Sequence, residues 1–216
     1  TADDNPQAVA ICEAFWSERE MTQDIERRVV VADMEIRKGE EGEPERMVGY
    51  AIRFNEASHD LGGFTEFVAP GAARAATEGD ADVLAFWNHD SGQVLGRKSA
   101  GTLKLTEDDQ GVRTEIIPPA WAANHLESIR RGDVKGMSFG FRVNSDTVTE
   151  LEDGSLTRTL NDIELMEVSP VSMPAYPSTS IDARELRSRV EAERTVTEAQ
   201  KIRVNAKRKM FGDDTD

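Results

Sequence analysis

The sequence has little of several things that would point to particular classes of protein. It contains one cysteine, Cys12, in 216 residues, which excludes an internal disulfide and a zinc site built on several thiolates. No stretch approaches the roughly 18 consecutive apolar residues of a membrane-spanning helix. The start of the chain, Thr1–Asp4, lacks the basic and then apolar order of a signal peptide. We therefore expect a soluble protein of a reducing compartment with no membrane partner.

Basic residues are also scarce. The chain has 26 Lys and Arg against 41 Asp and Glu, and its formal net charge is −15. A nucleic-acid-binding domain presents a basic face, so the charge argues against nucleic acid and against an anionic membrane as partners. The charge is uneven, because residues 183–216 contain nine basic and seven acidic residues, which leaves −17 on the first 182.

Motifs for metals and nucleotides are missing as well. The chain has no His-Glu-x-x-His, no paired cysteines, no G-x-x-x-x-G-K-[ST] and no strand-linked G-x-G-x-x-G. We therefore predict neither a metal nor a cofactor.

What is present divides the chain into three parts. Residues 1–24 form a polar lead-in with a short predicted helix over Ala8–Trp16. Residues 25–182 alternate short apolar runs with turn residues, which is typical of strands. Residues 183–216 have no proline and few apolar residues among many charges, which predicts a solvated helix, or a helix that needs a partner, ending near Phe211.

The middle part predicts many strands and few helices. We expect helices over residues 72–77 and 121–131, and strands over residues 29–36, 47–54, 82–87, 103–106, 112–116, 137–143 and 159–168. The turn Glu107–Gly111 predicts a hairpin between two of these strands. This pattern favours an α+β, mainly β fold built on a small closed or nearly closed β-barrel.

Three histidines are the candidates for acid–base chemistry near neutral pH. His59 falls in a predicted loop and His125 within a predicted helix, and both positions favour an exposed or packed role. His89 follows the apolar run Val83–Trp87, where a strand gives way to a loop. A rigid strand end is a common place for a catalytic side chain.

Residues 136–140, Gly-Met-Ser-Phe-Gly, match the G-x-S-x-G pattern of an exposed nucleophilic serine. The pattern is equally typical of a glycine-rich strand whose small residue packs against a neighbour. The α/β-hydrolase order places a histidine after the serine, and no histidine follows Ser138, which excludes that fold. A nucleophilic Ser138 would take its base from upstream, where His89 is the candidate.

The third member of such a triad is open at this point. Asp162, Glu164 and Glu167 all follow Ser138, and each is equally typical of a surface carboxylate. Glu167 lies near a predicted strand end, before Ser169 and Pro170.

A set of sequence blocks resembles the tailed-phage prohead (capsid maturation) protease family. The blocks keep their order over roughly residues 28 to 184 and are Val48–Ala51, Glu66–Ala72, Asn88–Asp90, Val94–Arg97, Gly101–Leu103, Asp109–Val112, Ile129–Lys135, Gly136–Phe141 and Leu165–Tyr176. The ordered set is specific where a single block is not.

The resemblance implies a serine endopeptidase that acts inside the viral procapsid, in the cytoplasm of a bacterial host. Its substrates would be scaffold segments or the N-terminal region of the major capsid protein, and it would process itself. The implied fold is similar to that of the herpesvirus assemblins, a small β-barrel ringed by helices, and assembly as a homodimer or larger oligomer follows only by analogy with them.

The resemblance also implies roles for single residues. His89 matches the catalytic histidine and Ser138 the nucleophile. The assemblins have a second histidine as third member, which this chain lacks, and Glu167 occupies the corresponding place. Two alternatives remain: a catalytically inactive capsid-assembly scaffold protein of the same fold, and an esterase or amidase that acts on small substrates.

Overall fold

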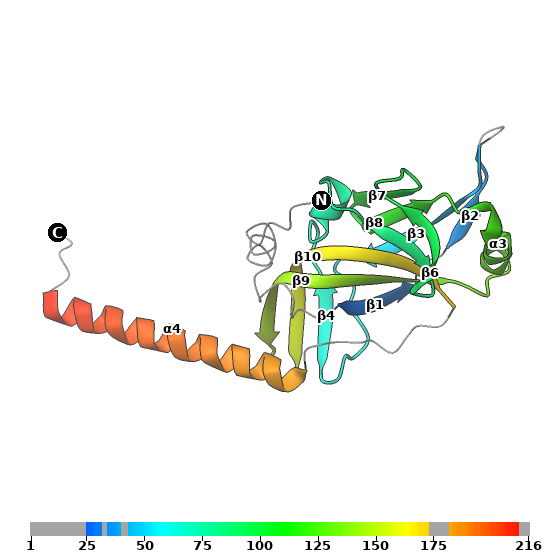
Figure 1. The fold of residues 1–216 in the computed structure, drawn as a ribbon. Coiled ribbons are helices and arrows are strands. Elements are labelled where there is room, and N and C mark those ends of the chain that lie inside the picture. The colour runs from blue at the N-terminus through cyan, green and yellow to red at the C-terminus, as the bar shows by residue number, and fades with distance from the viewer. Residues whose placement is uncertain (1–24, 32–33, 40–42, 173–181, 212–216) are drawn as a thin grey trace, which may run out of the picture.

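The computed structural model of the chain describes residues 25–31, 34–39, 43–172 and 182–211 (Figure 1). Cys12 and the helix predicted over residues 8–16 lie outside these ranges. The described strands are β1 (Glu26–Val31), β2 (Glu35–Arg37), β3 (Arg46–Arg53), β4 (Phe64–Val68), β5 (Leu84–Trp87), β6 (Asp90–Arg97), β7 (Leu103–Asp108), β8 (Gly111–Ile116), β9 (Gly136–Glu150) and β10 (Leu156–Val171). The helices are α2 (Arg74–Thr77), the 3-10 turn η1 (Ala120–Ala122), α3 (Ala123–Arg130) and α4 (Ala183–Phe211).

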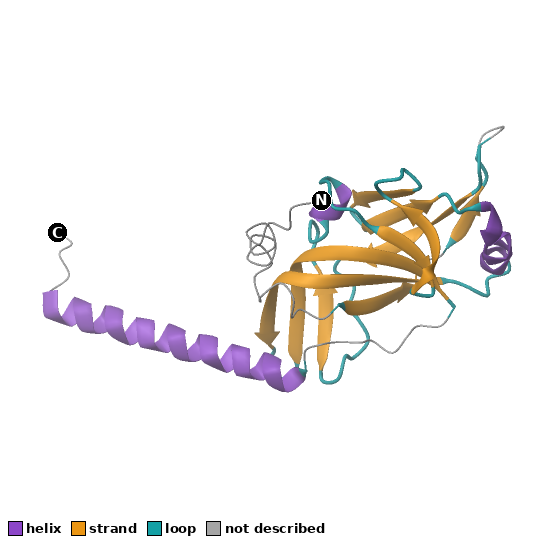
Figure 2. Cartoon of the chain, in the orientation of Figure 1, coloured by secondary structure: helices purple, strands orange, loops and turns teal. Residues whose placement is uncertain are grey.

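The described strands form two sheets, which gives the mainly β structure that the sequence predicts (Figure 2). The larger sheet has the order β1-β9-β10-β5-β6, with β4 also paired to β10. The smaller sheet has the order β2-β3-β8-β7. Each sheet ends in edge strands, so the described strands do not close into the expected barrel.

The departure from a barrel begins in the segment that was predicted as one strand over residues 29–36. It forms two strands that belong to different sheets. β1 pairs antiparallel with β9, whereas β2 pairs antiparallel with β3. The chain thus leaves the larger sheet after Val31 and joins the smaller one.

The core lies between the two sheets, and strand periodicity decides which β9 residues enter it. Met137, Phe139 and Phe141 are buried in the main apolar cluster, together with Met47 and Ile52 of β3. Successive side chains of a strand point to opposite faces. The alternate residues Ser138 and Gly140 therefore lie on the outer face of the larger sheet.

Among the side chains that the structure describes, helix α4 contacts the sheets through residues 183–194. Leu186 is fully buried in a second apolar cluster with Leu61, Phe64 and Leu156. Farther along, the helix extends away from the strands (Figure 1), and Val196 and Ile202 are exposed. No helix in the described part of the chain is long and apolar enough to cross a membrane.

Candidate active site

His89 lies in a two-residue turn between β5 and β6 that has an unusual backbone. Asn88 and His89 both have positive φ, at 50° and 63°, a conformation that residues other than glycine seldom adopt. The end of β10 holds this turn in place. The Asn88 N–H donates to the Pro170 carbonyl at 3.1 Å, and the Ser172 N–H donates to Asn88 Oδ1 at 3.1 Å. The imidazole therefore projects from a clamped position rather than from a mobile loop.

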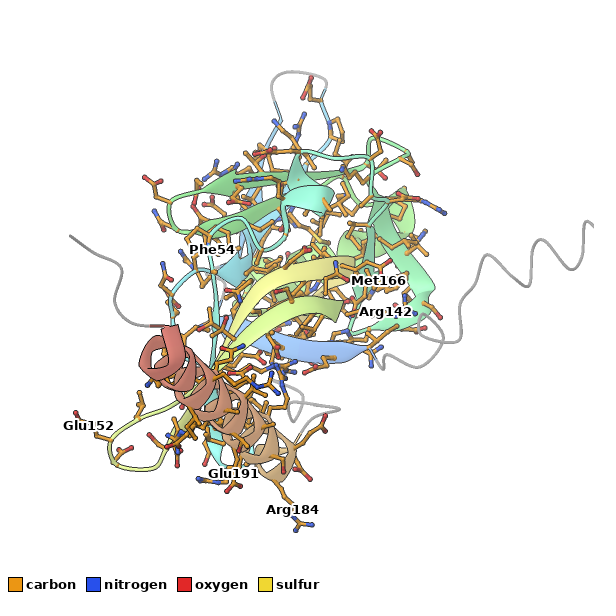
Figure 3. All side chains as sticks on the ribbon, turned by 90° about the vertical axis from the view of Figure 1, so that its left-hand side faces the viewer. Phe54, Arg142, Glu152, Met166, Arg184 and Glu191 are labelled. Carbon is orange, nitrogen blue, oxygen red and sulfur yellow. The ribbon has the colours of Figure 1, made fainter. Side chains whose placement is uncertain are left out.

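Glu167 reaches the same place because β10 contains a β-bulge. Leu165 is paired with Phe141 of β9, but Glu167 is paired with Gly140, which leaves Met166 as an extra residue. Regular alternation would turn Glu167 to the face of Leu165, which is in the core. The bulge turns it to the outer face, and bulges commonly re-aim side chains next to active sites. Met166 itself lies beside Arg142 (Figure 3).

His89 and Glu167 are in direct contact. Nδ1 of His89 lies 2.6 Å from Oε1 of Glu167, and both side chains are largely buried, with 15% and 7% exposed. An ionised carboxylate can only accept, so Nδ1 carries a proton, and in the neutral imidazole Nε2 is then an acceptor. Nε2 is buried and has no hydrogen-bond partner in the described structure. The pair thus presents an oriented base with a free nitrogen.

Gly140 provides the space for this carboxylate. A Cβ atom at position 140 would lie 2.7 Å from Oε1 of Glu167 and 3.0 Å from its Cγ. Any side chain there would displace the carboxylate. The second glycine of the G-x-S-x-G pattern therefore serves the acid rather than a turn at the serine.

Ser138 lies within β9, not at a sharp turn. It is fully buried, and it is paired with Ser169 of β10 on one side and Val29 of β1 on the other. Directly paired residues project from the same face, so Ser138 and Ser169 share the outer face with Glu167. The Ser138 hydroxyl donates to the Arg28 carbonyl at 2.9 Å. Among the described residues it has no hydrogen bond to His89.

Two residues that sequence reasoning did not select also contact Glu167. Nε of Arg27 lies 3.5 Å from Oε1. The Ser169 hydroxyl donates to Oε2 at 2.6 Å. The spacing Glu-x-Ser was visible in the sequence as two residues of one strand face. Nothing in the sequence placed β1, and hence Arg27, beside them.

The other candidates lie elsewhere. Glu164 is half-exposed and pairs with Arg142 at 3.3 Å, and Asp162 is exposed. His125 stacks on Trp87, with ring centroids 4.1 Å apart, and burial lowers its pKa. His59 lies in a loop on the wall of a cavity.

That cavity lies near the candidate site, although neither His89, Ser138, Glu167 nor Ser169 lines it. Its volume is about 770 Å³, and it runs beside β1. Val29, Gly136 and Val171 line it. Val29 is paired with Ser138, while Gly136 and Val171 lie two residues from Ser138 and Ser169 along their strands.

Three comparisons with known proteins each give a match. The family model of the caudovirus prohead serine protease matches residues 32–194. The prohead protease of Enterobacteria phage HK97 is 28% identical over 169 residues, which cover 76% of this chain and 71% of that protein. The solved structure of the bacteriophage T4 capsid assembly protease matches at 14% identity and a TM-score of 0.40, over 68% of this chain and 99% of that one.

The family match covers His89, Ser138, Ser169 and Glu167, and it ends within α4. It also spans most of the chain. The chain belongs to the caudovirus prohead serine protease family.

Proposed function

We propose that the chain is a serine endopeptidase of capsid maturation, with Ser138 as nucleophile, His89 as general base and Glu167 as the carboxylate that orients the histidine. The observation that carries the proposal is the 2.6 Å contact between Glu167 and His89 Nδ1, which leaves Nε2 free. Family membership supports the serine mechanism.

The reaction would follow the acyl-enzyme route. Nε2 of His89 takes the proton of the Ser138 hydroxyl as Oγ bonds to the substrate carbonyl carbon. Glu167 holds the imidazole in the required tautomer and stabilises the imidazolium that forms. His89 then gives the proton to the leaving amine as the C–N bond breaks. Water, with His89 again as base, releases the acyl group.

One movement has to precede this chemistry. The Ser138 hydroxyl is engaged by the Arg28 carbonyl, and the side chain is fully buried. Rotation about the Cα–Cβ bond would turn the hydroxyl away from the Arg28 carbonyl, on the same outer face where His89 and Glu167 lie. The free nitrogen of His89 is the acceptor that would compensate the lost hydrogen bond.

The substrate would be a polypeptide of the procapsid. The cavity of about 770 Å³ beside Val29, Gly136 and Val171 has room for several residues of an extended chain. The HK97 relative is a prohead protease and the T4 protein a capsid assembly protease by name. By analogy we propose that this chain cleaves a scaffold segment or the N-terminal region of the major capsid protein, and itself. It would do so as a dimer or larger assembly within the procapsid in the bacterial host.

The competing function is an assembly scaffold that has lost catalysis. Co-expression with the major capsid protein, followed by mass spectrometry of the capsid N-terminus, separates the two. We expect a shortened capsid protein with the wild-type chain and with the control Ser145→Ala, whose exposed serine lies farther along β9. We expect full-length capsid protein with Ser138→Ala. Full-length capsid protein in all three co-expressions, including the one with the wild-type chain, would contradict the proposal.

A further inference from the structure

The end of β10 carries a polar residue whose contacts join the two parts of the site. Ser169 is fully buried. Its hydroxyl donates to Oε2 of Glu167 at 2.6 Å and accepts the backbone N–H of His89 at 3.3 Å. A single side chain thus touches both the carboxylate and the backbone of the histidine that this carboxylate orients.

The hydroxyl fixes the carboxylate through the oxygen that His89 does not use. Oε1 of Glu167 faces Nδ1 of His89, and Oε2 receives the Ser169 hydroxyl. With both oxygens engaged, rotation of the carboxylate about its last bond would break one of two charge-assisted hydrogen bonds. Without Ser169, Oε2 would lose its donor in a site that is almost closed to water, since Glu167 is 7% exposed.

The same hydroxyl helps to hold the unusual turn. Asn88 and His89 both have positive φ, and such residues persist only where their surroundings determine them. Ser169 and Pro170 of β10, with Ser172 just beyond it, each make one hydrogen bond to this turn. Of these three residues, Ser169 alone makes its bond through its own side chain, so a substitution at position 169 removes that bond.

We propose that Ser169 is a positioning residue of the active site, which locks Glu167 and the backbone of His89 in one geometry while Ser138 performs the attack. This inference rests on the proposed function and adds a fourth residue to the triad. Ser138, the serine that matches the family's nucleophile, keeps the attacking role, while the Ser169 hydroxyl keeps its two bonds to Glu167 and to the backbone of His89.

Its contribution is measured best by two readouts. The first is the rate of capsid cleavage in co-assembled particles. We expect Ser169→Ala to lower this rate about 10- to 100-fold, the effect of one lost hydrogen bond to a charged group. Ser169→Thr keeps the hydroxyl and should cleave faster than Ser169→Ala. Ser145→Ala, the matched control on the same sheet, should cleave at the wild-type rate.

The second readout is independent of cleavage. In the Ser138→Ala background, the proton on Nδ1 of His89 should give a far-downfield proton NMR signal from its bond to Glu167. We expect the signal to persist in Ser138→Ala and in Ser138→Ala with Ser145→Ala. It should shift upfield or vanish in Ser138→Ala with Ser169→Ala. A serine that only fills space would leave this signal unchanged.

Two results would overturn the inference. One is a proton signal of His89 Nδ1 that is the same in Ser138→Ala with Ser169→Ala as in Ser138→Ala alone. The other is a Ser169→Thr variant that folds but cleaves no faster than Ser169→Ala, since the hydroxyl would then not be the group at work. Loss of the proposed function has a different signature, because cleavage by Ser138→Ala would refute the nucleophile while the NMR signal still reports on Ser169.

Discussion

The hairpin of β9 and β10 carries two polar clusters, one at each end, and they differ in how fully their groups are paired. The first is the candidate active site around His89, Ser138, Glu167 and Ser169. The second, which we name the buried ion cluster, consists of Glu26, Arg28, Glu66, Asp146, Arg158 and Arg189. Both clusters contain residues of β9 and β10.

The buried ion cluster is saturated. Arg158 lies within 3.1 Å of Glu26, Glu66 and Asp146. Arg28 binds Glu66 at 2.7 Å, and Arg189 of α4 closes the set on Asp146 at 2.5 Å. Buried charges are tolerated when they are paired and hydrogen-bonded in this way.

The carboxylates of the cluster show the balance between burial and pairing. The pKa of Glu66 is raised, because burial, the largest cause, and the nearby charge of Glu26 together outweigh the lowering by Arg28 and Arg158. Burial also acts to raise the pKa of Asp146, but the hydrogen bonds and charges of Arg189 and Arg158 together outweigh it and lower the pKa. The active site instead leaves Nε2 of His89 without a partner. The comparison teaches that the charged groups of the ion cluster are paired with one another, whereas the candidate site keeps a buried nitrogen of its base without a partner.

The largest expected effect is a loss of cleavage with little change in stability. Glu167→Gln keeps the shape but removes the charge that orients and stabilises the imidazolium, and we expect cleavage in co-assembled particles to slow about 10³- to 10⁴-fold. The melting temperature should stay within a few degrees of wild type. Glu164→Gln, a half-exposed carboxylate on the same strand, is the matched control and should cleave normally. Equal slowing by both variants would mean that Glu167 is not the third member.

The next largest expected effect is a loss of stability. Arg158→Met removes the cation shared by three buried carboxylates, and breaking a buried network in this way costs about 3–5 kcal/mol of the free energy of unfolding. Urea unfolding measures it. Arg97→Met is the control, because Arg97 is half-exposed beside Asp82 and should change stability by less than about 1 kcal/mol. Similar losses for both would contradict the division between the clusters.

A smaller loss of cleavage is expected from a substitution at Gly140, the glycine that makes room for the Glu167 carboxylate. Gly140→Ala would push the Glu167 carboxylate away from His89, and we expect cleavage to slow about 100-fold, as for other small displacements of a catalytic group. If the substitution acts through the carboxylate, it should add little to Glu167→Ala. Full additivity in this double-mutant cycle would show that Gly140 acts by another route.

The smallest effect depends on pH. The pKa of Asp146 is lower in the folded chain than its ordinary value of 3.8, so its pairing stabilises the fold above that pH and the benefit is lost as the pH falls below it. The difference in unfolding free energy between wild type and Asp146→Asn should therefore be constant from pH 7 to about 4.5. It should narrow below pH 3.8. A difference that widens with acid would contradict this account of the cluster.

Two residues of the candidate site, His89 and Ser138, could be selected from the local sequence. The turn after Val83–Trp87 marked His89, and the chain order excluded a hydrolase elbow at Ser138. The choice of Glu167 over Glu164 and Asp162 rested on the resemblance alone, because the bulge at Met166 decides its face and short-range periodicity places Glu167 with Leu165. A one-residue slip in a strand exchanges its two faces.

The fold was predicted less completely. The hairpin of β7 and β8 and the helical stretch near residues 120–130 follow the sequence pattern closely. The strands β4 and β6 were not predicted, and the break between β1 and β2 was missed. From its sequence neighbours alone, each charged residue of the buried ion cluster is predicted to lie on the surface. Its partners lie as far as 132 residues away in the sequence, so no local pattern shows that it is paired.

The central claim is that Ser138, and not Ser169 on the neighbouring strand, attacks the substrate. A fluorophosphonate, which forms a covalent bond with an activated serine, tests it directly in co-assembled particles. Trypsin places the two serines on different peptides, 136–142 and 159–184. We predict a single adduct on peptide 136–142, absent from Ser138→Ala and from His89→Ala. An adduct on peptide 159–184, or cleavage that continues with neither peptide labelled, would contradict the account.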